Sequence, residues 1–402
     1  MHIITLTEIQ FKNYSQLHSK RNYKQTINYA NVMKEYNYQP LYLGFIDNFD
    51  NVVCACLILC KKINNKYKIG YVKDGYLIDF TNYELLNNFT NSLKEYLNNL
   101  NFIYIEVTPN FAYKIFDSKN IVIKCYPNIL DNMKKSGYIS TGFNNEFNKY
   151  VAILNTTDNV DNTYNKLSRN IKRKIKDSKL SGITYFKNDD LNKFYELINK
   201  KKKTSIDYYN NLNKNYENDF EIYFAKINPL TYINNYRKLL ANEKRNNERF
   251  QELLINNNSK NNKILDRKMK SDKLINKYQN EVINASNLLS KYPDGLIIST
   301  IAIIKTDNTI YFIEEGYNDK EKDIHSIEGL KWEIIKTYIT KGYKIFNLGN
   351  LPSIRKDNKY YGLYLSKVGF NPRIYEYSGN FDLIINKYLY KITKVFNKDK
   401  FY

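Results

Sequence analysis

The sequence predicts a mixed α/β protein of two similar units, with a long helical hairpin inserted in the second. The chain has 402 residues, of which 43% are hydrophobic, enough for two cores of about 100 to 200 residues each. Apolar strand-like runs alternate with amphipathic helical segments in two successive cycles. Residues 231–290 contain neither Pro nor Gly, and apolar residues recur there at three- and four-residue steps, which predicts the inserted hairpin.

The first cycle spans residues 1–150. The spacing predicts helices at 19–36 and 85–97, and strands at 41–46, 52–60 and 102–107. Cys54, Cys56 and Cys60 share one parity in their strand, so we interpret them as small core residues in a reducing compartment. No partner pair of ligands accompanies them, and the chain has three histidines. We therefore expect no metal site.

The second cycle begins near residue 150 with a short strand. It continues with a helix at 163–180, a strand at 182–186 and a helix at 190–202. Strands at 295–305 and 309–314, a helix at 328–340 and a strand at 344–347 follow the insertion. Both cycles therefore predict strands covered by helices.

The insertion has two apolar stripes, separated by an Asn-rich tip at 256–262. Two such helices bury their stripes against each other, which predicts an antiparallel coiled-coil arm. Cationic residues near the tip suit binding to nucleic acid phosphates: Lys260, Lys263, Arg267, Lys268 and Lys270. The alternative is an ordinary solvated charged face.

The charge balance also indicates an anionic partner. The formal net charge is +21, which favours nucleic acid or an anionic membrane surface. Codon bias is the alternative, because Tyr, Asn and Ile are unusually frequent. The N-terminus resembles no signal peptide, and no apolar run of about 18 residues occurs. We therefore expect a cytoplasmic protein, with peripheral contact to the inner face of the membrane as a further option.

The C-terminal region carries the most specific pattern. Residues 362–370 read Gly-Leu-Tyr-Leu-Ser-Lys-Val-Gly-Phe, and residues 376–382 read Glu-Tyr-Ser-Gly-Asn-Phe-Asp. This resembles the G-L-x-x-F-K-x-G-F and E-Y-x-G-x-F-D segments of the Fem-type aminoacyltransferases, which build the peptidoglycan crossbridge. The resemblance implies transfer of an amino acid from charged tRNA to a lipid-linked or UDP-linked muropeptide, without a cofactor.

The resemblance also implies the organisation of the chain. Each unit would be a domain of the acyl-CoA N-acyltransferase (GNAT) type, the first formed by 1–150 with about 376–402 and the second by 151–375. The arm at 231–290 is similar to that of the FemA and FemB branch. Other Fem-type proteins are then potential partners.

Several residues match family positions for the substrates. The positions assigned to substrate contacts hold Lys34, Asp79, Lys203, Tyr208, Glu314 and Ser366. Glu314 stands where the family has a substrate-facing Tyr, and it is a second hypothetical general base besides Glu106. Lys34 falls one residue later than in the family, and an exposed helix Lys is the alternative. Lys203 and its neighbours would replace a family Arg, whose position holds Thr204. On the basic helix near residue 170, the resemblance assigns Arg169 and Lys172 to tRNA.

The expected chemistry needs few groups. Aminoacyl-tRNA is an activated ester, so an acceptor amine attacks it once deprotonated and positioned. Lys367 matches the family Lys near the tRNA end, where its cation would stabilise the oxyanion. Ser366 replaces the usual Phe beside it. Glu106, on a strand near the proposed cleft, is a hypothetical general base, with a salt bridge as the alternative.

Three functions remain open from the sequence. The first is transfer of an amino acid, with glycine, serine or alanine expected, to the stem peptide or crossbridge. The second is an immunity-type Fem homologue that confers resistance to a cell-wall endopeptidase. The third is a non-catalytic basic coiled-coil protein that binds RNA. No Gly-rich phosphate loop is present, which argues against ATP-driven activation of a free amino acid.

Overall fold

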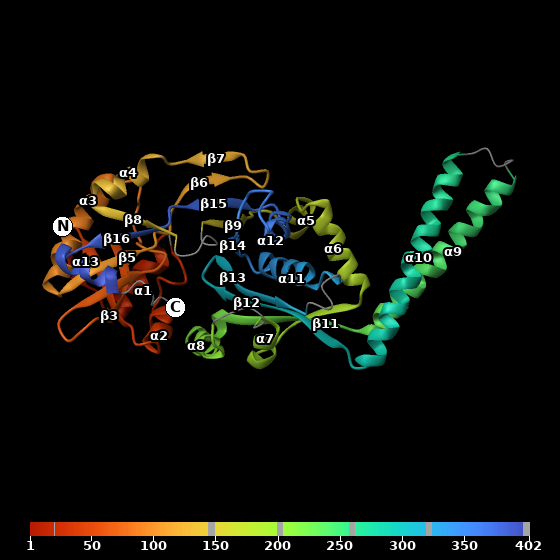
Figure 1. Cartoon of the computed structure of the whole chain (residues 1–402), viewed down its shortest axis with the longest axis horizontal. Coiled ribbons are helices and arrows are strands. Elements are labelled where there is room, and N and C mark those ends of the chain that lie inside the picture. The colour runs from red at the N-terminus through yellow and green to blue at the C-terminus, as the bar shows by residue number, and fades with distance from the viewer. Residues whose placement is uncertain (20, 144–148, 199–203, 257–261, 319–323, 397–402) are drawn as a thin grey trace.

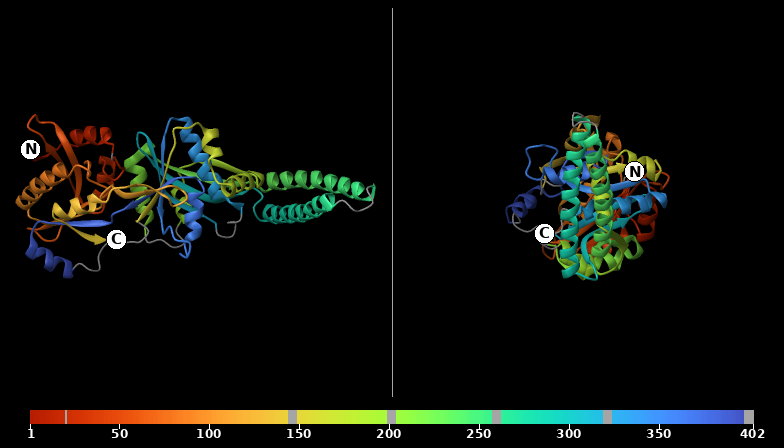
Figure 2. Two further views of the ribbon diagram at one scale, coloured as in Figure 1. Left: turned by 90° about the horizontal axis from the view of Figure 1, so that it is seen from above. Right: turned by 90° about the vertical axis from the view of Figure 1, so that its right-hand side faces the viewer.

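The computed structural model shows two α/β units side by side, with a helical arm projecting from the second (Figures 1 and 2). It describes the whole chain except residues 20, 144–148, 199–203, 257–261, 319–323 and 397–402. The mixed α/β class predicted from the sequence is confirmed.

The first unit is built on a seven-stranded sheet. Its order is β1 (His2–Thr5), β2 (Gln39–Ile46), β3 (Val52–Lys62), β4 (Lys68–Val72), β5 (Phe102–Val107), β16 (Asn380–Ile384) and β8 (Tyr138–Gly142). The neighbours β4 and β5 are parallel and are joined through α3 (Tyr83–Asn99), while α1 (Glu8–Leu17), α2 (Ile27–Lys34), α4 (Asn128–Lys135) and α13 (Lys387–Phe396) complete the unit. Cys54, Cys56 and Cys60 lie in the core between the sheet and α3.

The second unit is built on a nine-stranded sheet. Its order is β10 (Ile183–Lys187), β11 (Phe220–Ile227), β12 (Leu296–Lys305), β13 (Thr309–Tyr317), β14 (Ile345–Leu351), β9 (Tyr150–Asn155), β15 (Arg373–Tyr377), β6 (Ala112–Phe116) and β7 (Val122–Cys125). Its helices are α5 (Val160–Asn165), α6 (Arg169–Leu180), α7 (Leu191–Ile198), α8 (Ile206–Tyr216), α11 (Ser326–Thr340) and α12 (Tyr361–Val368), with a 3₁₀ turn at Glu217–Asp219.

Each sheet contains strands from a part of the chain that otherwise belongs to the other unit. β6 and β7, which the sequence boundaries group with the first unit, pair in the second sheet beside β15. From the other end of the chain, β16 enters the first sheet between β5 and β8. A third apolar cluster joins the units, because α2 packs against α8 and buries Tyr29, Tyr209 and Leu212. The units are thus connected by both chain crossings and a shared core.

Two predicted helices differ from the structure. The helix expected at 163–180 is broken into α5 and α6, because the Ser168 side chain accepts a hydrogen bond from the Ile171 amide and starts a new helix. The helix expected at 19–36 begins only at Ile27, because Thr26 caps it in the same way through the Tyr29 amide.

The arm consists of α9 (Pro229–Asn256) and α10 (Asn262–Lys291), which pack along each other. Small or apolar side chains such as Ser271, Ala285 and Leu288 are buried where the helices meet. At the root, Asn235 Nδ2 donates a hydrogen bond of 3.1 Å to the Leu180 carbonyl of α6. The arm therefore leaves the second unit between β11 and β12 and contacts the C-terminal end of the basic helix α6 at its root.

Candidate active site

A polar cleft runs between the two units. It comprises two cavities of about 400 and 410 Å³, which share Asn22, Asn110, Tyr311, Asn347 and Tyr377 in their linings. Asn22 and Asn110 come from loops of the first unit, whereas Tyr311, Asn347 and Tyr377 come from β13, β14 and β15. Tyr377 of the second unit donates a hydrogen bond of 3.4 Å to Asn110 of the first unit. The residues shared by the two cavities therefore connect the two units.

One wall of the first cavity carries two lysines, each paired with a carboxylate. Lys24 forms an ion pair of 3.0 Å with Asp74 and lines this cavity together with Lys73. Burial alone would lower the pKa of Lys24, but Asp74 and the rings of Tyr23 and Tyr29 hold that pKa well above its usual value. Lys24 therefore stays positively charged at neutral pH.

Gln25 organises this wall from behind. It is fully buried, accepts a hydrogen bond of 2.9 Å from the Leu57 amide and donates one of 2.8 Å to the Lys73 carbonyl. Because these bonds tie the loop after β4 to β3, they fix Lys73 and Asp74 at the cavity. The glutamine of the N-terminal family-like segment thus has a structural role.

Glu106 lies beneath the wall. Its buried carboxylate accepts a hydrogen bond of 3.1 Å from Lys73, and it faces the Asp382 position across the β5–β16 pair. Lys73 and Thr108 line the cavity, whereas Glu106 is outside its lining. The observed contact is the salt bridge that the sequence left as the alternative, and the general-base role remains a prediction.

Lys367 is outside the lining of the same cavity but reaches its edge. It stands in the last turn of α12, and its Nζ donates a hydrogen bond of 3.0 Å to the Asn350 carbonyl. A Cβ on Gly349 would be 3.2 Å from that Nζ. Asn350 and Gly349 both line the cavity, so the ammonium group is held at its edge. Ser366 is turned back onto its own helix, where its hydroxyl donates to the Leu363 carbonyl.

The start of α6 contacts the segment that carries Lys367. The Ser168 amide donates a hydrogen bond of 2.9 Å to the Gly369 carbonyl. A Cβ on Gly369 would come within 2.4 Å of Ile171, so glycine permits the approach. Arg169 is exposed on the adjoining first turn of α6, while Lys172 donates a hydrogen bond of 2.8 Å to the Asn165 carbonyl. Two predicted tRNA contacts therefore lie on the helix that abuts the Lys367 segment.

Other predicted substrate residues are distributed differently. Asp79 lines the second cavity, where it accepts hydrogen bonds from Thr81. Lys34 is exposed and pairs with Glu8 at 3.5 Å. Tyr208 packs near Tyr36 between α8 and α2, and Glu314 accepts a hydrogen bond of 3.3 Å from Tyr209. Lys34, Tyr208 and Glu314 are outside the linings of both cavities. Lys203 lies outside the described residues.

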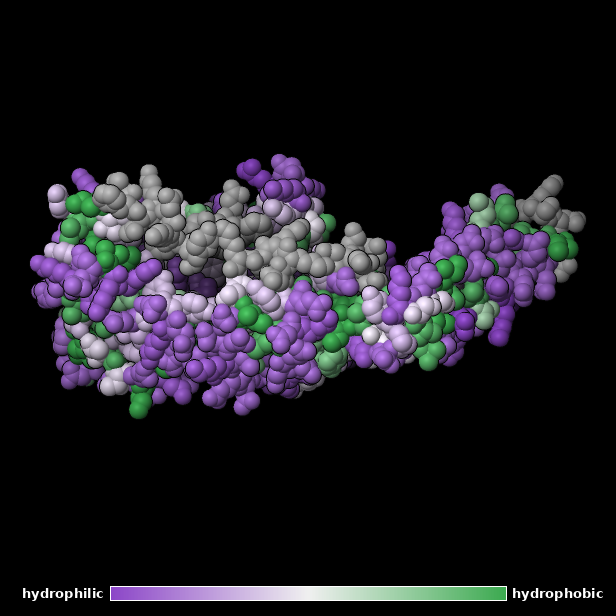
Figure 3. Space-filling model, turned by 60° about the horizontal axis from the view of Figure 1, so that its bottom comes forward, coloured by the Kyte–Doolittle hydropathy of each residue, from purple (hydrophilic) through white to green (hydrophobic). Residues whose placement is uncertain are grey.

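The arm presents its predicted cations to solvent. Lys263, Arg267 and Lys270 are exposed, whereas Lys268 pairs with Asp272 at 3.2 Å. Lys260 lies outside the described residues. Figure 3 shows polar side chains over most of the visible face, with apolar patches along the arm.

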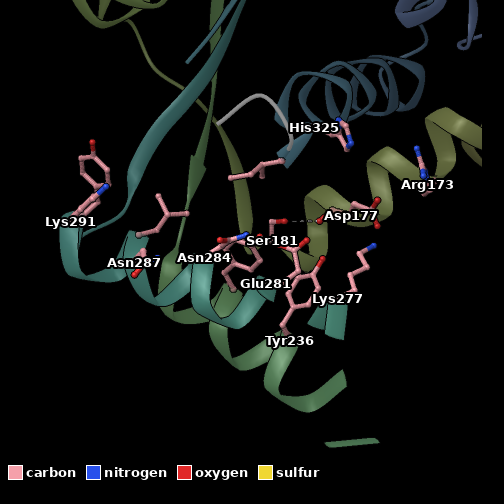
Figure 4. Close-up of a pocket in the computed structure, with 14 residues that line it drawn as sticks. Arg173, Asp177, Ser181, Tyr236, Lys277, Glu281, Asn284, Asn287, Lys291 and His325 are labelled. Carbon is pink, nitrogen blue, oxygen red and sulfur yellow. Dashed lines mark hydrogen bonds between the residues drawn. The ribbon is translucent and has the colours of Figure 1, made fainter. Parts of the chain in front are cut away.

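A third cavity, of about 560 Å³, lies at the root of the arm between α6 and α10 (Figure 4). Arg173 and Lys277 line it together with the carboxylates of Asp177 and Glu281. Tyr232 donates a hydrogen bond of 2.5 Å to Glu281. Because cations and carboxylates are mixed here, we interpret this cavity as part of the arm's attachment.

The cysteines and histidines form no metal centre in the part of the chain that is described, where no group of three or more His, Cys, Asp or Glu side chains is suitably placed. Burial raises the pKa of the Cys60 thiol to about 12. This thiol is therefore protonated and suits a core position rather than a reactive one.

Glu376 and Gly379 have structural roles in the second C-terminal segment, residues 376–382. Glu376 is buried and accepts hydrogen bonds from Tyr113 at 2.7 Å and Tyr150 at 3.4 Å, which joins three strands of the second sheet. Gly379 has a φ of +86° and approaches the Gly142 carbonyl closely. Between them, Tyr377 is thereby directed to the cleft.

Sequence reasoning missed Lys24 and Lys73. A single lysine in a chain with 62 Lys and Arg residues carries no signal of its own. The family-like segments on either side were the available indication, since Lys24 precedes Gln25 and Lys73 precedes the loop that ends at Asp79.

Comparison with known proteins agrees with this architecture. The FemAB family model matches residues 6–398. The chain is 24% identical over 375 residues to aminoacyltransferase FemA of Staphylococcus epidermidis, covering 89% of this chain and 90% of the relative. It is 23% identical to FemA of Staphylococcus aureus, covering 100% and 99%. The crystal structure of FemX is similar with a TM-score of 0.72 at 19% identity, covering 98% and 99%. The chain belongs to the FemAB family.

Proposed function

We propose that this chain, an aminoacyltransferase of the FemAB family, transfers an amino acid from charged tRNA to the stem peptide or crossbridge of a peptidoglycan precursor. The observation that carries the proposal is the position of Lys367, whose ammonium group is held at the edge of a cleft shared by both units. The family relationship supports the peptidoglycan acceptor.

The proposed step is attack of an acceptor amine on the ester carbonyl. The carbon–nitrogen bond forms, the carbonyl oxygen becomes an oxyanion, and the amine nitrogen gives up a proton. As the carbonyl re-forms, the carbon–oxygen bond to the ribose breaks and the ribose oxygen takes up a proton. Lys367 would stabilise the negative charge on either oxygen. A preorganised donor of this kind contributes roughly 10²- to 10³-fold in rate. The ester is already activated, so this chemistry needs no cofactor.

The acceptor would bind through its anionic groups. Lys24 and Lys73 line the same cavity as Gly349 and Asn350, at whose edge Lys367 is held, and a muropeptide precursor carries both phosphates and carboxylates. Asp79 in the second cavity is a candidate contact for a cationic amine or a hydroxyl of the same substrate.

The donor would reach the cleft along α6. This helix abuts the Lys367 segment at its N-terminal end and the arm at its C-terminal end. Phosphates of tRNA would therefore meet Arg169 first and the arm cations further from the cleft. We expect the enzyme to work in the cytoplasm, at the inner face of the membrane.

Transfer of labelled amino acids from a charged-tRNA pool to purified precursor tests this function. The wild type should label the muropeptide, with glycine, serine or alanine as the expected residue. Lys367→Met should lower kcat roughly 10²- to 10³-fold with a smaller effect on KM, because it removes stabilisation needed mainly in the transition state.

The matched control is Lys359→Met, which removes an exposed lysine just before α12 and should leave kcat unchanged. Equal activity of wild type and Lys367→Met would remove Lys367 from the mechanism. Salt-sensitive tRNA binding without any transfer would instead support the non-catalytic RNA-binding function.

A further inference from the structure

The last helix, α13, is attached to the first sheet by one face. Leu389, Tyr390 and Thr393 are partly or fully buried on that face. Tyr390 donates a hydrogen bond of 2.8 Å to Asp382, and Lys394 pairs with the same carboxylate at 2.8 Å. Asp382 itself is fully buried. The orientation of α13 on the sheet is therefore fixed by a buried polar anchor.

The opposite face of α13 exposes apolar and cationic side chains together. Tyr388 is 75% exposed and Ile392 is 39% exposed, and their spacing of four residues puts them side by side. Lys387 and Lys391 form the adjacent exposed row. On β8, Ile139 is 49% exposed and lies directly opposite Asp382 in register, so it points to the sheet side that α13 covers. These five residues are called the α13 face.

The surroundings of this face are cationic. Lys394 is neutralised by Asp382, but Lys387 is close enough to Lys94 of α3 for its charge, in addition to burial, to lower the pKa of Lys94. An anionic partner is therefore favoured over a neutral apolar one.

The combination of side chains distinguishes between anionic partners. RNA phosphates would attract the lysines but leave the aliphatic side chains in water. The surface of an anionic bilayer accepts both, because tyrosine and isoleucine enter the headgroup region while lysines contact charged headgroups. Within the described residues, no helix is long and apolar enough to cross a membrane, so such contact would be peripheral.

The location of the face is suitable for a lipid-linked acceptor. Strand β16 carries Asn380, which lines the first cavity, and Asp382, which anchors α13. Two residues of a strand span about 7 Å. By contrast, the arm tip is separated from the unit by α9 with its 28 residues, or about 42 Å, and it projects from the opposite end of the molecule (Figures 1 and 2).

We propose that the α13 face docks the protein onto an anionic membrane surface and so holds the cleft at the height of a lipid-linked acceptor. Binding to the membrane depends only on the side chains of the α13 face, whereas its role in reaching a lipid-linked acceptor rests on the proposed function. Tyr388 and Ile392 insert shallowly, and Lys387 and Lys391 contact anionic headgroups.

Sedimentation of the full chain with vesicles tests the docking. Vesicles of phosphatidylglycerol and phosphatidylethanolamine should bind the wild type, whereas phosphatidylcholine vesicles should not. The double variant Lys387→Gln/Lys391→Gln should lower the partition coefficient about 25-fold, from about fivefold for each lysine. Tyr388→Ser/Ile392→Ser should lower it at least about tenfold.

The arm supplies the matched control. Leu265 and Met269 are 45% and 53% exposed among lysines and arginines near the tip, so Leu265→Ser/Met269→Ser changes a similar surface elsewhere. This variant should bind vesicles as the wild type does. Loss of binding in the arm variant alone, equal binding to neutral vesicles, or no binding to either vesicle would overturn the proposal.

Transfer to two acceptors separates this proposal from the proposed function. With a soluble UDP-linked acceptor, the α13 variants should match the wild type. With a lipid-linked acceptor in vesicles, their apparent KM should rise as their vesicle binding falls. Normal vesicle binding without transfer to either acceptor would reject the proposed function while leaving the docking intact, and an unchanged KM in the vesicles would reject the docking role.

Discussion

At the scale of single residues, the close approach at Gly369 joins two parts of the candidate site. The Gly369 carbonyl accepts the amide of Ser168, which is also the N-cap of α6. No space for a Cβ exists on the side of Ile171. The position of Lys367 relative to the basic helix α6 therefore depends on glycine at position 369, because any larger residue would collide with Ile171.

Replacement of Gly369 by alanine should separate these segments. We expect Gly369→Ala to lower the free energy of unfolding by about 1 to 3 kcal/mol, because the new methyl group overpacks the contact with Ile171, and to lower kcat for transfer. Gly362 offers the control, since a Cβ there meets open space on the same helix. Gly362→Ala should be neutral or stabilise by up to about 1 kcal/mol. Urea unfolding of both variants measures the difference, and equal effects would contradict the packing argument.

Some residues of the candidate site could be identified from the sequence, and others could not. Lys367 and the C-terminal segments around it could be singled out from the sequence because several residue types recur at fixed spacing, and the catalytic role of Lys367 stays a prediction. Lys24 and Lys73 were not, because their importance comes from burial beside Asp74 and Glu106, which only the tertiary structure creates. Lys34 had a sequence match but lies on an exposed helix end, outside the cleft linings.

At the scale of elements, one carboxylate joins three strands and a helix of the second unit. Glu221 of β11 is buried and accepts hydrogen bonds from Lys187 of β10 at 3.1 Å and Lys305 of β12 at 2.9 Å. Tyr223 of β11 and Tyr338 of α11 donate to the same carboxylate. The network connects the sheet edge to the helix that covers it.

The pKa of Glu221 predicts a pH-dependent stability. Burial tends to raise this pKa, but the hydrogen bonds from Tyr338, Tyr223 and the two lysines lower it to about 2. Because the folded pKa lies below the unfolded value near 4.5, the stabilisation is present above pH 4.5 and is lost as pH falls towards 2. It amounts to about 3 kcal/mol at neutral pH.

Glu221→Gln should therefore be less stable than the wild type at pH 7, and the difference should narrow below pH 4.5. Urea unfolding at several pH values measures it. Glu196→Gln removes a surface pair with Lys193 and should cost less than about 1 kcal/mol. A constant deficit of Glu221→Gln from pH 7 to pH 2 would show that packing, rather than charge, explains its effect.

Element prediction succeeded where periodicity was long and failed where single residues intervene. The two arm helices and half of the strands in the described residues follow from their apolar spacing, whereas strands such as β4, β11 and β16 were not predicted. The break between α5 and α6 depends on one capping serine. β6 and β7 were not predicted, because β7 is fully exposed and lacks the apolar alternation of a buried strand.

At the scale of the whole molecule, lysines and arginines occur both on the arm and at the cleft. If tRNA binds along α6 and the arm, affinity should depend on where cations lie and not merely on the net charge of +21. Removing one lysine or arginine that binds a phosphate should reduce the slope of log affinity against log salt by about 0.7 to 0.9.

The triple variant Lys263→Gln/Arg267→Gln/Lys270→Gln should therefore weaken tRNA binding and reduce this slope by about 2 to 3. Lys61→Gln/Lys62→Gln/Lys66→Gln removes the same charge from exposed positions at the β3–β4 turn and should leave the slope unchanged. Filter binding at several salt concentrations measures both slopes. Equal effects in the two variants would make net charge, rather than the arm, responsible.

The placement of β16 has a consequence for biosynthesis. The ribosome completes β5 and β8 long before residue 380, yet β16 must lie between them. Chains grow at about 5 to 20 residues per second, so the 242 residues from Gly142 to Ile384 (384 − 142) take roughly 12 to 50 s. Throughout this interval the nascent first sheet lacks the strand that separates β5 from β8. The first sheet, together with the Asn380 lining that β16 contributes to the first cavity, is therefore complete only when translation is nearly finished.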